Sequence, residues 1–393
     1  MKFSSVITLS TSRTADPASA GIDRFVGLEH IEPENLHIRS WGLVADGTTF
    51  TSTFKHGQVL FGKRRAYQRK VAVADFDGVC SSDIYVFESK DPNVLLPELV
   101  PFICQSEGFY DYAVKTSAGS LSPRTNWSHL ANYEFHLPTL DEQKNIYESL
   151  KSFDDDIETK RNLLESLNKL FKSTQTNLML GRDYTTPKKH SPLGDIPKEW
   201  NWIELGELGN FSNGVSKPGS EFGSGTPFVN LQDVFGKVVI NTLPEGKVKV
   251  SKKEIVSQGV IKNDILFVRS SVKRVGVGLT VLIDTDWSGA DVVFAGFLIR
   301  FRLTSDLVIP KFANYLFHEV HFRRLLLASS TESLNTNINQ QQLKTLPCVL
   351  PPISIQEEIS GKLDSILNAI HTLESHIEQT NKLKSTFLNH HLG

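Results

Sequence analysis

The chain has 393 residues, more than one ordinary hydrophobic core takes up, so we expect at least two domains. Hydrophobic residues at 39% and charged residues at 22% indicate a globular protein and exclude a disordered one. The sequence has three scattered cysteines, no signal peptide and no apolar run of the ~20 residues that a membrane helix needs. These features predict a cytoplasmic protein without membrane contact. The net charge of −2 excludes a generally basic surface, so any nucleic-acid binding must rest on local clusters or on basic partners.

Residues 1–137 predict a first mixed domain. Short β-branched and aromatic runs bounded by Gly, Asp and Ser, such as residues 58–61 and 84–87, predict strands. A helical stretch is expected near residues 97–107, after these strands. Strands followed by a helix favour an α+β domain.

Two polar segments of this domain are candidates for DNA contact. The first follows the strand at 58–61 and is strongly basic, and the second covers residues 117–126 before the next long helix. Arginine forks can bind phosphates and guanine edges, and Ser, Asn and Tyr can donate to either. The alternatives are a solvated hairpin turn for the first segment and helix caps or turns for the second. The candidate residues are Lys63, Arg64, Arg65, Tyr67, Lys70, Ser120, Arg124 and Asn126.

Residues 138–180 predict a long helix, because no proline follows Pro138 until Pro187. Apolar residues recur at alternating spacings of four and three, which is a heptad pattern. A helix of this length cannot bury one apolar stripe alone, so it needs a partner. Asp154–Asp156 is interpreted as a solvated face. The expected helix-pair core residues are Ile146, Leu150, Phe153, Ile157 and Leu164.

A linker at residues 181–195 leads to a second mixed domain, residues 196–350, with the same organisation. Residues 277–283 and 292–301 predict strands, and residues 310–328 predict a helix. A basic segment and a polar segment again lie after a strand and before a long helix. Their candidate DNA-binding residues are Arg269, Ser271, Lys273, Arg274, Asn335 and Asn337. His318 and His321 lack further ligands at metal spacing and are interpreted as a surface pair.

Residues 351–393 predict the second long helix, again heptad-patterned. Its expected core residues are Ile359, Leu363, Ile366, Ile370, Leu373 and Ile377, after which the pattern weakens at Thr380 and Lys384. The linker returns the chain, so we expect the two helices to pair antiparallel with one domain at either end. Pairing with another chain is the alternative.

The chain repeats itself at an offset of 213 residues. Residues 121–180 fall on residues 334–393, and 15 of the 60 pairs are identical without a gap. The two heptads are in register at this offset. The chain is therefore expected to have a pseudo-twofold repeat, in which a variable domain followed by a long helix occurs twice.

Catalytic motifs are missing from the sequence. It contains no GxxxxGK[ST] phosphate loop, no Asn/Asp-Pro-Pro-aromatic methyltransferase motif and no GxSxG nucleophile. We therefore expect no catalytic residues, no metal and no cofactor bound by this chain itself.

The duplicated pattern resembles the specificity subunits of Type I restriction–modification systems. The motif LPxxxxQxxI occurs at Leu137–Ile146 and Leu350–Ile359, each time before a heptad helix. Residues 57–84 and 194–208 resemble the core of a recognition domain and the entry into one.

This resemblance implies a DNA-binding subunit without catalysis of its own. Each domain would read one half of a bipartite, asymmetric site in double-stranded DNA, and the helix pair would set the spacer. Two modification subunits would dock on the chain, and restriction subunits could join. S-adenosylmethionine and ATP would bind only to those partners.

Two other functions are compatible with the pattern. One is a coiled-coil scaffold whose end domains bind proteins, although such domains have no reason to repeat a basic segment at equivalent positions. The other is a stand-alone bipartite DNA binder or the specificity subunit of another restriction class.

Overall fold

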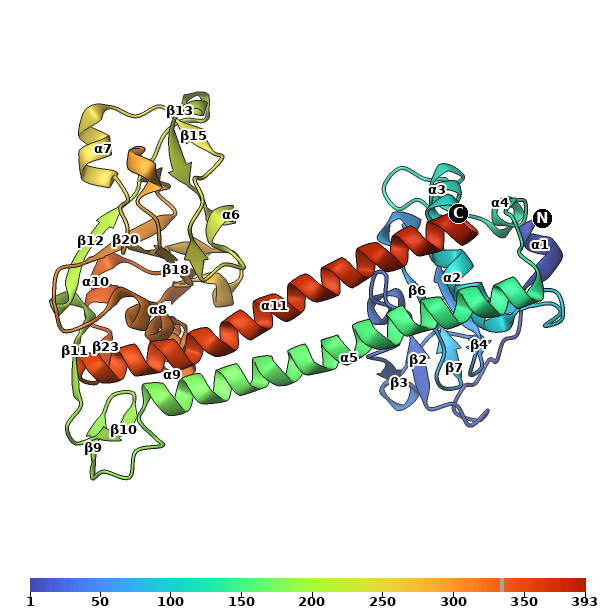
Figure 1. Cartoon of the computed structure of the whole chain (residues 1–393), viewed down its shortest axis with the longest axis horizontal. Helices are drawn as coiled ribbons and strands as arrows, with labels where there is room; N and C mark the ends of the chain where they lie inside the picture. Colours follow the sequence, from blue (N-terminus) through green and yellow to red (C-terminus); the bar gives the residue numbers. More distant parts are fainter. Residues whose placement is uncertain (333–335) are drawn as a thin grey trace. The chain divides into compact units, whose positions relative to one another are not determined.

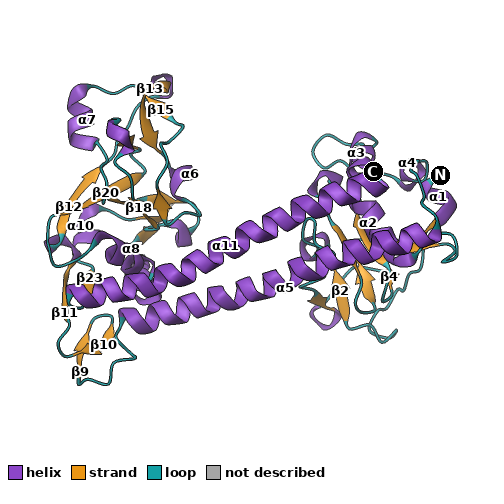
Figure 2. Cartoon of the chain, viewed as in Figure 1, coloured by secondary structure: helices purple, strands orange, loops and turns teal. Residues whose placement is uncertain are grey.

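The computed structural model describes residues 1–332 and 336–393 and contains two compact units. The first unit comprises Met1–Leu163 and Leu373–Gly393, and the second comprises Leu164–Thr372. Both long helices, α5 (Leu140–Met179) and α11 (Ile353–Leu392), contribute to each unit (Figure 1). The mixture of strands and helices expected for each half is visible in Figure 2.

The globular part of the first unit combines two four-stranded sheets with short helices. In the first sheet, in the order β1-β8-β5-β6, neighbouring strands are antiparallel, and Leu60 lies opposite Val86. The second sheet has the order β3-β2-β7-β4. The strands are β1 (Ile7–Leu9), β2 (Arg24–Val26), β3 (Gly42–Leu43), β4 (Ser52–Phe54), β5 (Val59–Gly62), β6 (Val71–Val73), β7 (Gly78–Cys80) and β8 (Ile84–Ser89). The helices are α1 (Phe3–Val6), α2 (Val100–Gln105), α3 (Glu107–Lys115) and α4 (Trp127–Leu130).

An aromatic core joins these elements to the helix pair. Phe3, Phe61, Phe87 and Phe109 are fully buried, and the Phe3 and Phe109 rings lie 4.9 Å apart. Leu150 of α5 and Leu388 and Leu392 of α11 complete the same cluster. The two helices are thereby anchored to this domain, because their apolar stripes are covered by its core.

The second unit is built around a five-stranded sheet in the order β12-β20-β16-β18-β14. Its strands are β12 (Gly209–Asn213), β14 (Val239–Ile240), β16 (Ile265–Val268), β18 (Thr280–Ile283) and β20 (Leu298–Leu303). Smaller sheets contain β11 (Asn201–Glu204) with β23 (Pro347–Leu350), and β13 (Phe222–Val229) with β15 (Lys247–Val248) and β19 (Val293–Phe294). The helices are α6 (Leu231–Val234), α7 (Lys252–Gln258), α8 (Pro310–His318), α9 (Val320–Ser329) and α10 (Gln340–Lys344). The segment expected to be a linker, residues 181–195, contains β9 (Lys188–Ser191), which forms a hairpin with β10 (Gly194–Pro197) at the start of the expected second domain.

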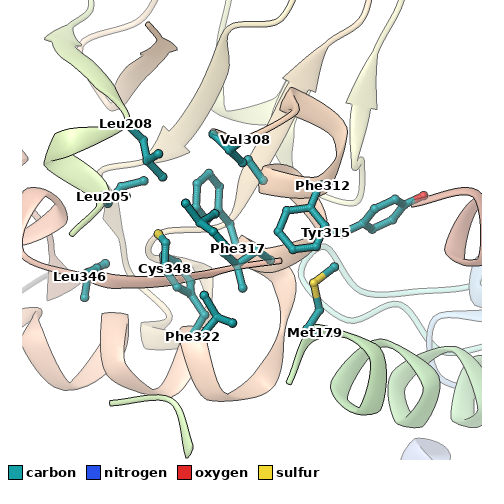
Figure 3. Close-up of a cluster of buried hydrophobic side chains, with 14 of the residues drawn as sticks. Met179, Leu205, Leu208, Val308, Phe312, Tyr315, Phe317, Phe322, Leu346 and Cys348 are labelled. Atoms are coloured by element: carbon teal, nitrogen blue, oxygen red, sulfur yellow. The ribbon is translucent and has the colours of Figure 1, made fainter. Parts of the chain in front are cut away.

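The core of this unit again includes both long helices. Phe312, Phe317 and Phe322 of α8 and α9 pack with Cys348 of β23 and Met179 of α5 (Figure 3). Ile359 and Leu363 of α11 belong to the same cluster.

The long helices run antiparallel. In the first unit, Asp154 of α5 contacts Lys384 of α11 at 2.7 Å, and Lys160 contacts Thr380 at 3.1 Å, so residue numbers rise along one helix as they fall along the other. The antiparallel pair expected from the two heptads is therefore confirmed. Of the expected seam residues, Ile146, Leu150, Ile157, Ile359, Leu363, Ile370 and Leu373 are buried, whereas Phe153, Leu164, Ile366 and Ile377 are partly buried.

The seam contains charge where the second heptad weakens. The Lys384 side chain is only 7% exposed, and Asp154, at 15%, binds both its ammonium and His37 Nε2, the latter at 3.3 Å. Asp155 and Asp156 are exposed. The interpretation of this acidic run as solvated is therefore wrong for Asp154, because an almost buried lysine needs a counter-charge.

One glutamine of each LPxxxxQxxI motif fastens a long helix to its domain. Gln143 Oε1 accepts from Leu96 N at 2.8 Å, and its Nε2 donates to the carbonyls of Val94 and Pro138 at 2.9 Å. Both motif glutamines are buried.

Gln356 makes the same three bonds in the second unit. Its Oε1 accepts from Ile309 N at 3.0 Å, and its Nε2 donates to the carbonyls of Leu307 and Pro351 at 2.8 Å. The repeat thus extends to individual hydrogen bonds, each satisfying backbone groups beside a domain–helix junction.

Candidate nucleic-acid interface

In the first unit, the two polar segments predicted to bind DNA form one surface. The Thr125 amide donates to the Lys63 carbonyl at 3.0 Å, and the Arg65 amide donates to the Pro123 carbonyl at 2.7 Å. Arg64 and Arg124 face each other in an isolated antiparallel bridge. Residues about sixty positions apart are therefore held together through their main chains.

The cations of this surface are organised around one carboxylate and one hydroxyl. Asp83 accepts from Arg124 Nε at 2.8 Å and contacts Arg64 Nη1 at 3.3 Å. Ser122 Oγ accepts from Arg64 Nη2 and Arg65 Nη2, both at 3.1 Å. Burial raises the pKa of Asp83, but the two guanidinium groups lower it by more than burial raises it. The pKa of Asp83 therefore lies below its usual value. Asp83 thus holds Arg64 and Arg124 in fixed directions, and the Ser122 hydroxyl holds Arg65 beside them.

The basic segment itself has an unusual backbone. Arg65 and Arg69 adopt left-handed φ angles of 55° and 53° on either side of the 3₁₀ turn η3 (Ala66–Gln68). Such a conformation costs a non-glycine residue ~1–3 kcal/mol, and it persists only where the surroundings impose it. Strained loops of this kind are common at binding sites.

Some cations of the segment are engaged within the domain. Arg69 binds Glu107 and Glu34, and the Lys70 ammonium donates to the Leu28 carbonyl at 2.6 Å. The Lys63 ammonium lies 4.5 Å from the centre of the Tyr85 ring, and burial lowers its pKa. The remaining candidates, Tyr67, Ser120 and Asn126, are exposed to solvent.

The second unit brings its two polar segments together in an equivalent way. Strand β17 (Ser270–Ser271) pairs with β22 (Thr336–Asn337), which also pairs with β21 (Thr331–Glu332). The Ile338 amide donates to the Arg269 carbonyl at 2.9 Å. This bond corresponds to the one from Thr125 to Lys63 in the first unit. Asn335, also a candidate, lies outside the described residues.

The side chains of the second surface differ in their pairing. Arg269 and Lys273 are exposed, and in the part of the chain that the structure describes neither side chain has a hydrogen-bond or ion-pair partner. Arg274 is also exposed, with Nη2 3.3 Å from the Leu327 carbonyl. Two cations are therefore available for phosphates here without breaking an internal bond.

The asparagines before the two short helices also differ. Asn339 Oδ1 accepts from Gln342 N at 2.9 Å and so caps α10. Asn126 precedes α4 without a side-chain cap. Capping thus accounts for Asn339 and leaves the Asn126 side chain available.

The two histidines of the second domain are engaged in hydrogen bonds. His318 Nε2 lies 2.9 Å from the Thr280 carbonyl, and burial lowers its pKa to about 4. His321 Nδ1 lies 2.8 Å from Oε1 of the buried Glu319. Both side chains are thus satisfied and partly buried rather than fully exposed, and α8, which carries His318, packs against β18. Among residues 1–332 and 336–393 there is no group of three metal-ligating side chains, and no helix is long and apolar enough to cross a membrane.

Comparison with known proteins identifies the family of this architecture. The family model described as Type I restriction modification DNA specificity domain matches residues 34–169 and 197–382. The chain is 25% identical to the Type I restriction enzyme MjaVIII specificity subunit of Methanocaldococcus jannaschii, over 97% of this chain and 84% of that protein.

Two solved structures have a similar fold. The S subunit of a Type I restriction–modification system from M. genitalium has a TM-score of 0.55 at 13% identity, covering 100% of this chain and 95% of that one. A chain from a study of complex assembly and conformational transition of the type I R-M system has a TM-score of 0.58 at 20% identity, covering 100% and 96%.

Proposed function

Because the chain belongs to the specificity subunits of Type I restriction–modification systems, we propose that each of its two domains binds one half of a bipartite, asymmetric site in double-stranded DNA. The observation that carries this proposal is the repeated surface. In each unit a basic segment and a distant polar segment are joined by an equivalent main-chain hydrogen bond. A scaffold whose end domains bind proteins has no need for the same pairing of a basic and a polar segment in both halves.

The chemistry of the first surface suits base-edge recognition. Asp83 and Ser122 hold Arg64, Arg65 and Arg124 in place, so less side-chain entropy is lost when a guanidinium binds a guanine or a phosphate. Exposed Tyr67 offers a ring and a hydroxyl at the same segment.

The second surface carries two cationic side chains that have no partner among the described residues. Arg269 and Lys273 can bind phosphates at once, because no described residue has to release them. Ser271 and Asn337 lie on the paired strands β17 and β22 beside them and can donate to base edges.

Catalysis and cofactors are assigned to partner subunits in this proposal. Modification subunits, two per chain, would dock on it and use S-adenosylmethionine to methylate a flipped base in the bound site. Restriction subunits, where present, would use ATP. The helix pair would set the spacer between the half-sites.

Co-expression with a Type I modification subunit tests the proposal. We expect host DNA to acquire methylation at a bipartite motif, and an exchange of residues 1–137 for a relative's domain to alter one half of that motif only. A stable complex that leaves the DNA unmodified would favour the scaffold instead. No complex with any modification subunit would refute the docking part.

Charge-removal variants test the surfaces themselves. Arg269→Ala with Lys273→Ala should weaken duplex binding about 10-fold or more and lower its salt dependence by roughly two counterions, since each phosphate contact releases about one. The matched control is Lys252→Ala with Lys253→Ala, which removes the same charge from exposed positions of α7. Equal losses from both double variants would indicate nonspecific charge attraction and contradict the proposed surface.

A further inference from the structure

A groove lies beside the basic segment of the second unit. It has a volume of about 490 Å³ and is lined mainly by apolar side chains. Its lining includes Phe235, Ser270, Ser271, Val272, Lys273, Val275 and Phe297. None of them is acidic.

The apolar side chains at this groove are unusually open to water. Val272 is 84% exposed, Val275 69%, Phe297 58% and Phe235 42%. Burial of each of these side chains would be favourable, by ~25 cal/mol for every Å² of apolar surface removed from water. Clustered apolar exposure of this kind marks a surface that contacts another molecule.

The backbone beside the groove forms a tight turn. The Arg269 amide donates to the Phe297 carbonyl at 2.8 Å, and the Gly276 amide donates to the Lys273 carbonyl at 2.9 Å. Gly276 lies so close to Ser271 that a Cβ on it would be 2.5 Å from Ser271 Oγ. These contacts hold the segment in a tight turn, with Val272 and Val275 on its exposed part.

Charge indicates what occupies the groove. Lys273 lines the groove, and Arg269 immediately precedes Ser270 of the lining. The Arg269 side chain is exposed and has no ion-pair or hydrogen-bond partner among the described residues. An apolar surface bordered by such cations is complementary to a base edge flanked by phosphates. In the major groove of DNA, the apolar group that a base presents is the C5-methyl of thymine.

We propose that the second domain recognises a thymine in its half-site by enclosing the C5-methyl group in this groove. Val272 and Val275 contact the methyl group, and the hydroxyls of Ser270 and Ser271 lie within the lining to bind polar atoms of the same base pair. This inference rests on the proposed DNA-binding function and adds the base that the second domain selects.

The first domain differs at the corresponding positions. Where LFVRSSV of the second domain has two serines and an exposed valine, LFGKRRA of the first has Arg64, Arg65 and Ala66. Ala66 is 2% exposed, whereas Val272 is 84% exposed. The first domain therefore has no exposed valine at this place, and its half-site serves as the internal comparison.

The test is a deoxyuridine scan of the site found by methylation sequencing, using the complex with its modification subunits. Deoxyuridine pairs as thymine does but lacks the methyl group. At one thymine of the second half-site, we expect the replacement to raise the Kd about fourfold, the equivalent of ~0.8 kcal/mol for one buried carbon. Replacement at thymines of the first half-site should leave the Kd unchanged.

Two variants connect the effect to the groove. The double variant Val272→Ala with Val275→Ala should bring the fourfold ratio of the thymine and deoxyuridine Kd values close to one. It should keep the melting temperature of the parent, because both side chains are exposed. Arg269→Ala should weaken binding of both duplexes and keep their fourfold ratio.

Several outcomes would overturn the inference and leave the proposed function standing. One is a second half-site of G·C pairs only, and another is equal Kd values for thymine and deoxyuridine at every position. A third is that the valine variants bind DNA normally but lose a modification subunit, which would make the groove a protein contact. Absence of any duplex binding by the complex would instead refute the proposed function itself.

Discussion

Replacing Gln356 by alanine tests the strongest structural equivalence between the two halves. The substitution removes three hydrogen bonds from a fully buried side chain: one from the Ile309 amide and two to the carbonyls of Leu307 and Pro351. A typical bond contributes ~1 kcal/mol net, so we expect a loss of about 3 kcal/mol in the free energy of unfolding. The backbone groups left behind are beside the α11 terminus and would stay unpaired unless water enters.

The measurement is urea unfolding of Gln356→Ala, together with hydrogen exchange of the Ile309 amide. Gln143→Ala should lose a similar free energy, because its three bonds have nearly the same lengths. The matched control is Gln379→Ala, an exposed glutamine of α11, which should change stability by less than ~0.5 kcal/mol. Losses below ~1 kcal/mol at both buried positions would refute the view that these glutamines fasten the helices to the domains.

Three further perturbations have expected outcomes. Asp154→Ala should lower stability in urea by ~3–5 kcal/mol because it leaves Lys384 almost buried without a counter-charge, and adding Lys384→Met should recover most of the loss; no recovery would show that the packing of Asp154, rather than its charge, is what matters. The contribution of His318 to stability should fall by about 3 kcal/mol as the pH drops from 6.5 towards 4, because the unfolded chain protonates His318 while its lowered pKa keeps it neutral in the folded one. His318→Gln should lose this part of the pH dependence in thermal melts, and an unchanged slope would contradict the assignment. Arg65→Val should be ~1–2 kcal/mol less stable than Arg65→Gly in the same melts, because a β-branched residue tolerates the left-handed φ poorly, and equal stability would argue against an imposed backbone.

Of the whole architecture, the internal repeat could be predicted in most detail, down to the alignment of single residues. The 213-residue offset aligns Gln143 with Gln356, and their hydrogen bonds are equivalent in the structure. The heptads likewise predicted two long helices, which span Leu140–Met179 and Leu392 back to Ile353 in antiparallel order. Such features are accessible because periodicity along the chain is set by local helix geometry.

The pairing of charges could not be predicted in the same way. Arg64, Asp83 and Arg124 are far apart along the chain, and only folding makes one carboxylate the partner of two guanidinium groups. The equivalent basic segment of the second half has Arg269 unpaired among the described residues, although both segments looked alike as clusters of positive charge.

Two related halves, two long helices and a basic segment after a strand in each half can all be predicted from the order of the residues, because repeats and hydrophobic periods are local properties of the chain. The position of Asp154 in the helix seam against Lys384, and the open groove bordered by Val272 and Phe297, arise only when the chain folds. Both results depend on which distant residues meet, and burial of a charge or exposure of an apolar side chain follows from those meetings rather than from residue type.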